Sequence, residues 1–444
     1  MSKPPFPELL HVFGRIGLLS FGGPAGQVAL MHKELVDDRA WISEEHFLRA
    51  LNFCHLLPGP EAQQLAAYIG WRLHGLRGGL AAGMLFVIPG AFVIWALSVL
   101  YVHAAGLDWF AALFIGVKAA VLALVVQAVL RIARRALNTP FKWIVSATAF
   151  LSLFVLNLPF PVVVLGAGLL GIIAAAYRPD WLKLKAPIEP IDRPPTLKLV
   201  STTLRTIGAW CVVWAVPIIV VWVFLGPAHV LTDISLFFSQ LAVVTFGGAY
   251  AVLAYMAQEA VQSYHWLNAG EMADGLGLAE STPGPLIMVT QFVGFLGAYR
   301  APAPFSPLVA GTIGAALTTW VTFAPCFLYI FAFAPWIERL EHARRLQGGL
   351  SALTAAVVGV IANLAVWFAL HVLFRRVDRV RWGGLQLQSP DLRSVDLLAL
   401  FLSVLAFVLL FRTKLGVLGT LAICAVSAIA AHWFYPEQKD DLHV

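Results

Sequence analysis

The segment Ser20-Phe21-Gly22-Gly23-Pro24 returns 225 residues later as Thr245-Phe246-Gly247-Gly248-Ala249. The same offset aligns further identical residues without a gap: Met31 with Met256, Glu34 with Glu259, Trp41 with Trp266, and Pro58-Gly59-Pro60 with Pro283-Gly284-Pro285. Between residues 20 and 60, twelve of 41 positions are identical, whereas average composition supplies about two or three by chance. The chain therefore contains a duplicated unit, and the shared residues are candidates for its working parts.

The later part of the duplicated unit aligns at a larger offset of 236 residues. This offset pairs Pro89 with Pro325, Gln127 with Asn363, and Lys118-Ala119-Ala120-Val121 with Thr354-Ala355-Ala356-Val357. The second copy thus holds eleven extra residues between Pro285 and Pro325, and we expect the insertion around Arg300 to Pro307.

The composition is that of a membrane protein, since 60% of the 444 residues are hydrophobic and only 12% are charged. Such a chain cannot cover a water-facing surface with polar groups. Several apolar runs meet or approach the ~20 residues that cross the hydrocarbon core: 79–102, 109–130, 143–176, 207–226, 350–374 and 395–411. Because unpaired strand edges are excluded there, the sequence predicts an all-α polytopic fold.

Glycine and proline interrupt the apolar segments at the repeated motifs. Glycines followed by proline are typical of one helix ending and another beginning, so residues 8–35 predict a helix broken at Gly22-Gly23-Pro24. Pro58-Gly59-Pro60 breaks the chain again before a short helix at 61–73. Residues 36–50 are amphipathic, with Ser43 as the expected N-cap, and we expect them at the membrane interface.

Four regions follow from these patterns: a first repeat at 1–177, a cytoplasmic linker at 178–200, a connecting span at 201–231, and a second repeat at 232–444. The connecting span has no counterpart in the first repeat, so an odd number of crossings predicts an inverted repeat. Basic loops at 131–142 and 336–347 then lie in the cytoplasm, as the positive-inside rule requires. The segment 375–393, with five arginines, lies outside and conflicts with that rule.

The repeated motifs resemble the chromate ion transporter family in its long, two-domain form. The resemblance rests on Phe21-Gly22-Gly23-Pro24, Trp41, Leu57-Pro58-Gly59-Pro60 with Gln64-Leu65-Ala66, and the second copies Thr245-Phe246-Gly247-Gly248 and Thr282-Pro283-Gly284-Pro285. It covers nearly the whole chain. The resemblance implies a multi-pass protein of the bacterial inner membrane that exports chromate and confers chromate resistance, with two antiparallel homologous halves.

Chromate and sulfate are tetrahedral dianions, and the free N–H groups at helix N-termini suit such ligands. Inverted-repeat transporters commonly bind substrate on broken helices at the midplane. The predicted substrate site therefore contains the helix breaks of both repeats, with Gln64 and Lys118: Phe21, Gly22, Gly23, Pro24, Pro58, Gly59, Pro60, Gln64, Lys118, Phe246, Gly247, Gly248, Pro283, Gly284 and Pro285. The alternative is that these glycines and prolines only permit kinks and close packing.

Five further residues are candidates for charge or coupling, because ionised groups are rare at membrane depth and usually face a partner or an aqueous path. They are Arg15, Glu34, His55, Glu259 and Glu280. Arg15 equally suits snorkelling to the interface, the two matched acids equally suit helix capping or pairing, and Lys118 equally suits pairing with a carboxylate.

No metal or cofactor is expected, since the four cysteines lack Cys-x-x-Cys spacing and the twelve histidines lack zinc spacing. The expected partners are an oxyanion and membrane lipid, with protons and a second copy of the chain as open alternatives and no nucleic acid. Transport of sulfate or another oxyanion remains the first alternative function. An intramembrane enzyme using His55, Glu280 or Glu34 is a remote one, because no nucleophile motif is present.

Overall fold

The structure is a computed structural model that describes residues 4–21, 23–104, 106–184, 196–246, 249–382, 385–413 and 415–434. Its elements are overwhelmingly helical, which confirms the predicted fold class. Within these described ranges, seven helical segments are long and apolar enough to cross a membrane: Glu61–Ala104, Asp108–Ala136, Phe160–Tyr177, Leu197–Leu225, Pro307–Trp336, Arg344–Leu373 and Val417–Phe434. A multi-pass membrane protein follows from their number and length.

The first half contains α1 (Phe6–Leu19), α2 (Gly23–His32), the π-helical turn η1 (Lys33–Asp37), α3 (Glu44–Leu56), α4 (Glu61–Ala104), α5 (Asp108–Ala136), α6 (Pro140–Phe154), α7 (Phe160–Tyr177) and η2 (Pro179–Leu182). As predicted, the Ser43 side chain caps α3, accepting a hydrogen bond from the His46 N–H. The connecting helix α8 (Leu197–Leu225) follows. Residues 185–195, about half of the predicted linker, lie outside the described residues.

The second half contains α9 (Val230–Val244), α10 (Ala249–Gln258), the π-helical turn η3 (Glu259–Ser263), α11 (Ala269–Ser281), η4 (Leu286–Met288), α12 (Val289–Arg300), α13 (Pro307–Phe333), η5 (Ala334–Trp336), α14 (Ile337–His342), α15 (Arg344–Leu373), β1 (Val377–Trp382), β2 (Leu385–Pro390), η6 (Leu392–Ser394), α16 (Leu397–Arg412) and α17 (Val417–Phe434). The antiparallel hairpin β1–β2 is an addition to the predicted all-helical fold.

Each half folds one pair of helices into a tight antiparallel hairpin. In the first half, non-helical backbone at His74 and Gly75 divides α4 into two arms, and a Cβ added at Gly70 would lie 2.3 Å from the Gly78 carbonyl oxygen. In the second half, α12 and α13 form the same contact, since a Cβ added at Gly314 would lie 2.4 Å from the Gly294 oxygen. Small residues permit this close packing. The longer connection in the second half, residues 301–306, falls where the sequence predicts the insertion.

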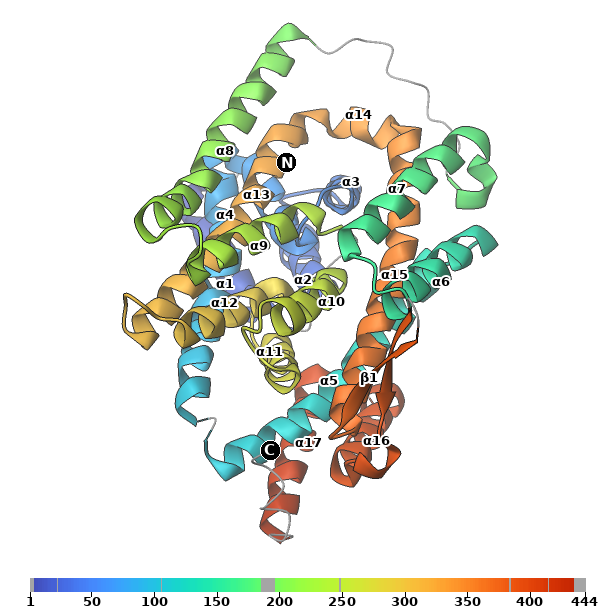
Figure 1. Ribbon diagram of the computed structural model, residues 1–444. Coiled ribbons are helices and arrows are strands. Elements are labelled where there is room, and N and C mark those ends of the chain that lie inside the picture. The colour runs from blue at the N-terminus through green and yellow to red at the C-terminus, as the bar shows by residue number, and fades with distance from the viewer. Residues whose placement is uncertain are drawn as a thin grey trace.

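The two halves exchange helices. The α15 helix of the second half packs against α6 and α7 of the first, and α5 of the first half packs against α16 and α17 of the second (Figure 1). Both contacts are close, because Gly171 faces the Gly348 backbone and Gly116 faces the Cys424 backbone. The buried core accordingly mixes both halves, placing Val121 and Phe114 in one cluster with Phe292.

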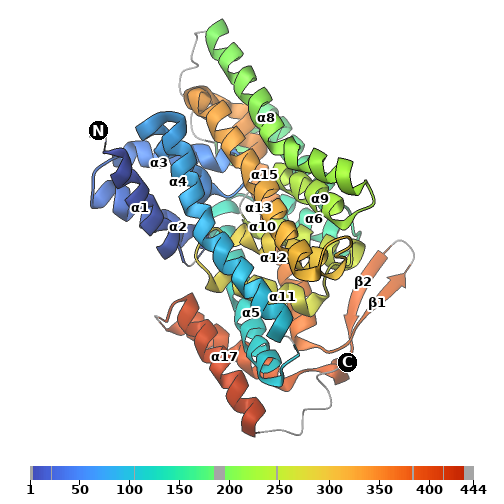
Figure 2. The ribbon, with the colours of Figure 1, turned by 90° about the vertical axis from the view of Figure 1, so that its left-hand side faces the viewer.

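Basic loops gather at one end of the molecule. The Thr139 hydroxyl donates a hydrogen bond of 2.6 Å to the Trp181 carbonyl, which joins the loops before α6 and after α7. Leu182 lies beside Gly348, near the beginning of α15. Since the 30 residues of α15 extend about 45 Å, the hairpin that follows α15 lies at the opposite end, where Figure 2 shows it projecting from the helices.

Candidate functional site

Four short segments separate the broken helices, and we call them the four tips: residues 20–23, 57–60, 245–248 and 282–285. Two backbone hydrogen bonds join tips from different halves. The Gly59 N–H donates to the Thr245 carbonyl at 2.7 Å, and the Gly284 N–H donates to the Ser20 carbonyl at 3.0 Å. Each helix break of one half is therefore bonded to a helix break of the other half.

The two bonds are equivalent under the repeat. Ser20 corresponds to Thr245, and Gly59 corresponds to Gly284, so exchanging the halves turns one bond into the other. Contacts of this reciprocal kind are what a two-fold axis between related units produces. Within each half, a histidine ring also contacts a backbone carbonyl distant in sequence: His74 contacts the Pro4 carbonyl and His229 contacts the Ala303 carbonyl, each at 2.7 Å.

Glycine is required at the centre of both Pro-Gly-Pro tips. Gly59 has a φ of +118° and Gly284 a φ of +96°, a region that L-residues rarely adopt. A Cβ added at Gly59 would lie 2.8 Å from Gln64 Nε2 and 2.9 Å from Cys326 Sγ. A Cβ added at Gly284 would lie 3.2 Å from the Gly90 Cα. The prolines on either side limit the backbone further, since each ring sets its own φ.

The Gly59 and Gly284 amides are not free for a ligand, because each donates to the other half. The unpaired donors belong to the helices that follow. The first turn of α4 leaves the N–H groups of Glu61, Ala62 and Gln63 without intrahelical acceptors, since the first such bond runs from the Gln64 N–H to the Pro60 carbonyl. In the second half the chain enters the 3₁₀ turn η4 instead, where the Met288 N–H donates to the Pro285 carbonyl at 2.9 Å.

Buried side-chain amides line the tips. Gln27 donates to the Gly284 carbonyl at 2.5 Å, and Gln64 donates to the Pro58 carbonyl at 2.6 Å. Within the described residues, several fully buried atoms have no hydrogen-bond partner: Ser20 Oγ, both polar atoms of the Gln63 amide, and Gln64 Oε1. Buried polar groups are nearly always paired, so unpaired ones mark a place for water or a ligand.

The predicted site residues divide by position. Gly22, Gly247 and Gly248 lie outside the described residues. Phe21, Gly23, Pro24, Pro58 and Phe246 are half-buried in the tips, and the remaining motif residues are buried there: Gly59, Pro60, Pro283, Gly284 and Pro285. The chain thus brings the described motif residues together, while Lys118 and the charged candidates occupy other positions.

Arg15 and Glu34 form part of one charged cluster, which joins α1 to η1. Glu34 is buried, lies 3.7 Å from the Arg15 guanidinium, and makes a short ion pair with Arg39. Arg15 remains half exposed. Glu34 lies in η1, and its repeat counterpart Glu259 begins η3, so each half places its acid in a π-helical turn. Such turns occur frequently at functional sites.

His55 and Glu280 occupy matching positions near the Pro-Gly-Pro tips. His55 is half exposed, and its ring lies 3.5 Å from Glu61, the first residue of α4. Glu280 is 5% exposed, near the end of α11. A carboxylate at a helix N-terminus is favourable for the helix, but it competes with an anionic ligand for the same N–H groups.

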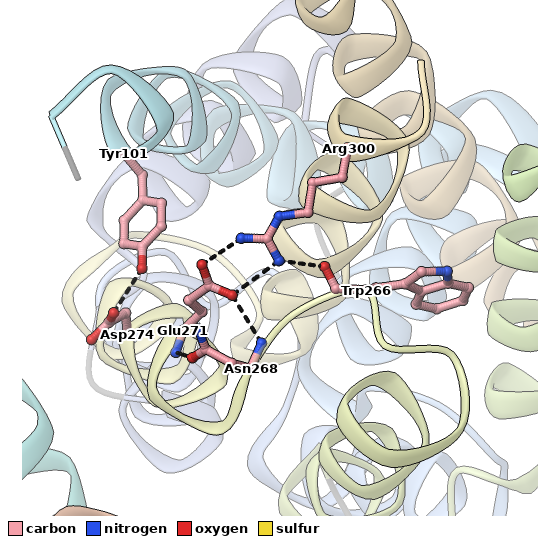
Figure 3. Close-up of polar contacts among 6 residues, drawn as sticks. All are labelled: Tyr101, Trp266, Asn268, Glu271, Asp274 and Arg300. Atoms are coloured by element: carbon pink, nitrogen blue, oxygen red, sulfur yellow. Dashed lines mark hydrogen bonds and ion pairs between the residues drawn. The ribbon is translucent and has the colours of Figure 1, made fainter. Parts of the chain in front are cut away.

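Lys118 contributes to a second buried polar cluster, which sequence reasoning missed. Its Nζ lies 3.2 Å from Asp274 Oδ1, and the Tyr101 hydroxyl donates to Asp274 Oδ2 at 2.7 Å. Figure 3 shows Tyr101 pointing at Asp274 and, one turn earlier on α11, Glu271 bonded to Arg300 and Asn268. Lys118 thus has the carboxylate partner that was its alternative role. An acid inside the small-residue stretch 269–281 was the available signal for Asp274.

The cluster has no counterpart in the other half. At the corresponding positions, Arg49 replaces Asp274 and Thr354 replaces Lys118. Arg49 is exposed and pairs with Glu45, whereas Asp274 is 5% exposed. The tips are therefore shared by both halves, but this buried ion pair belongs to one side only.

His32, at the exposed end of α2, supplies a pH-dependent contact. Its hydrogen bond with Glu44, together with the Asp37 charge, raises the pKa of the ring above 6.5. The charged form is favoured in the folded state, so the stabilisation is complete below the unfolded pKa and disappears as the pH rises through the folded one. We expect His32→Asn to lower the melting temperature more at pH ~5.5 than at pH ~9, either side of the ordinary histidine pKa. Equal losses at both pH values would contradict this role.

A family model and several relatives of known name agree on the family of this chain. A family model described as Chromate transporter matches residues 7–172 and 232–431, which is one match in each half. The chain is 30% identical to the chromate transport protein of Pseudomonas aeruginosa, over 98% of this chain and 94% of that protein. It is 28% identical to the probable chromate transport protein of Synechococcus elongatus, over 81% and 83% of the two chains.

A third relative, the chromate transport protein of Cupriavidus metallidurans, is 27% identical over 82% of each chain. No solved structure matches the chain. Together, a family model that matches both halves and relatives that align over most of their length show that the chain belongs to the chromate transporter family.

Proposed function

We propose that this protein exports chromate across the bacterial inner membrane and confers chromate resistance. The observation that carries the proposal is the meeting of the four tips, where α4 offers its first N–H groups beside buried, unpaired amide and hydroxyl atoms. Hydrogen-bond donors at a helix N-terminus suit a tetrahedral dianion. The names of the relatives supply the substrate.

The proposed unit of transport is an inverted pair of repeats, residues 1–177 and 232–444, joined by a cytoplasmic linker and α8. With the basic loops at the end of Thr139, Trp181 and Gly348 placed in the cytoplasm, the first two tips approach the centre from the cytoplasmic side. The last two tips approach from outside. A shared site reached from both sides is the arrangement that alternating access needs.

The membrane potential favours export. Moving one charge through 100 mV changes its free energy by ~2.3 kcal/mol, so a dianion leaving a negative cytoplasm gains ~4.6 kcal/mol. That free energy sustains a gradient of about 10³ without proton coupling. Uptake would instead need more than two co-transported cations. Glu34 and Glu259 remain the candidates for proton coupling.

Chromate flux in everted membrane vesicles tests the proposal directly. Collapsing the potential with valinomycin and potassium should abolish most chromate accumulation, whereas collapsing only the pH gradient with nigericin should leave most of it. Vesicles without this protein are the control. Flux that follows only the pH gradient would refute the potential-driven mechanism.

Sulfate transport by the same architecture is the second candidate, because the donors at the tips recognise tetrahedral shape and charge rather than the central atom. Transport of each labelled ion decides between them. If chromate is the substrate, labelled chromate should accumulate in the vesicles and labelled sulfate should accumulate little, even where sulfate competes for the same donors. Sulfate accumulation with little chromate flux would reverse the assignment.

A further inference from the structure

A second polar cavity lies away from the tips, beneath the β1–β2 hairpin. Five neutral amide side chains from different segments line it, and we call it the amide pocket: Asn157, Gln258, Gln262, Asn363 and Gln388. They come from the α6–α7 connection, α10, η3, α15 and β2, so the pocket joins both halves. Trp367 forms part of its apolar wall.

The amide groups are arranged for a ligand rather than for one another. Among the described residues, one hydrogen bond joins two of them, from Gln258 Nε2 to Asn157 Oδ1 at 3.1 Å. Gln388 Oε1 is buried without a hydrogen-bond partner among the described residues. A terminal amide can rotate and exchange its oxygen for an NH₂ group, so each side chain can present up to two donors. Unpaired buried polar atoms of this kind call for a ligand or water.

The amide set is not reproduced at the repeat-equivalent positions. At the repeat-equivalent positions of the first half, Lys33 replaces Gln258, Asp37 replaces Gln262, and Gln127 replaces Asn363. Asp37 there contacts His32, and Gln127 accepts from Arg131. The duplication alone therefore does not account for five neutral amides facing one cavity.

The surroundings favour an anion over a cation. The described residues that line the pocket carry no charge. The segment 375–393, which supplies Gln388, contains five arginines and two aspartates. Arg376 and Arg393 are exposed and line, together with Arg375 and Asp391, a depression at the base of the hairpin. A net positive segment raises the local concentration of anions. Neutral hydrogen-bond donors can then bind an anion less tightly than a charged side chain would.

We propose that the amide pocket is a second binding site for a tetrahedral oxyanion, at the outer end of the transport path. It rests on the proposed function for its ligand class and orientation. Gln258 ends the helix that begins at the third tip, so the pocket lies about 15 Å from the tips along the ten residues of α10. The proposal also gives the arginines of this outer segment a role that the positive-inside rule does not.

Equilibrium dialysis of the purified full-length protein against labelled sulfate and chromate tests the proposal. We expect two oxyanions per chain. Gln262→Leu and Asn363→Leu, on different elements, should each remove one of them and leave the other. Gln127→Leu is the matched control, since Gln127 is the repeat counterpart of Asn363 but lies outside the pocket, and it should retain both.

The outcomes separate the two proposals. A single oxyanion per chain that survives both pocket variants would overturn the amide pocket and leave the transport proposal intact. If the unaltered protein binds no oxyanion, the result would count against both the amide pocket and the proposed transport site. Binding of labelled sodium that Asn363→Leu abolishes, without change in oxyanion binding, would show that the amide oxygens hold a cation instead. Size-exclusion profiles identify any variant that fails to fold.

Discussion

Replacing Gly284 by alanine is expected to reduce chromate flux about tenfold or more, because a left-handed backbone costs an L-residue ~1–2 kcal/mol. The added Cβ would also lie only 3.2 Å from the Gly90 Cα. A backbone shift that lengthens this contact would displace the Gly284 N–H, which donates to the Ser20 carbonyl. The measurement is chromate flux in everted vesicles, normalised to the amount of protein in the membrane.

Gly208→Ala is the control for this prediction, since Gly208 lies in α8 with no atom within 4 Å of an added Cβ. It should transport normally. Gly59→Ala should behave like Gly284→Ala, because the two glycines hold equivalent bonds. Normal flux in both tip variants would mean that the joined tips are not part of the transport path.

Lys118→Ala is the second substitution with a large expected effect, and it should abolish transport while the protein remains in the membrane. The change removes a cation and leaves Asp274 buried without its ion-pair partner. Breaking one side of a buried ion pair typically costs ~3–5 kcal/mol. Flux and thermal stability must therefore be measured together.

The double variant Lys118→Ala/Asp274→Asn separates the two roles of Lys118. Asparagine removes the stranded charge and can still accept the hydrogen bond from Tyr101. If Lys118 binds the oxyanion, the double variant should regain stability but not flux. Recovery of both would show that Lys118 serves only to neutralise Asp274.

The sequence predicts the helix breaks well because glycine and proline act locally. Gly59 and Gly284 combine a positive φ with flanking prolines. These are local preferences of glycine and proline, so the sequence indicates the breaks without knowledge of any tertiary contact. The duplication also shows which residues of the two halves correspond. It does not predict the hydrogen bonds between tips of different halves, because the bond between Gly59 and Thr245 depends on how the halves pack together.

Side-chain partners were harder to anticipate for the same reason. For Glu34 the sequence leaves capping and pairing open, and the structure shows pairing, with Arg39 and with Arg15 of α1. Asp274 is far from Lys118 and Tyr101 in sequence, so its environment exists only after α4, α5 and α11 pack. The hairpin β1–β2 was missed because a short connection between long apolar helices carries little periodicity.

The exchange of helices between the halves constrains how the protein is made. When the ribosome has completed α5, the partners of that helix have not yet been synthesised, since α16 and α17 begin 261 and 281 residues later. A nascent first half therefore keeps one flank of α5 open to lipid or to insertion factors until translation ends. Truncation before Leu397 should leave an incompletely assembled chain that membrane quality-control proteases degrade, even though the remaining sequence is unchanged.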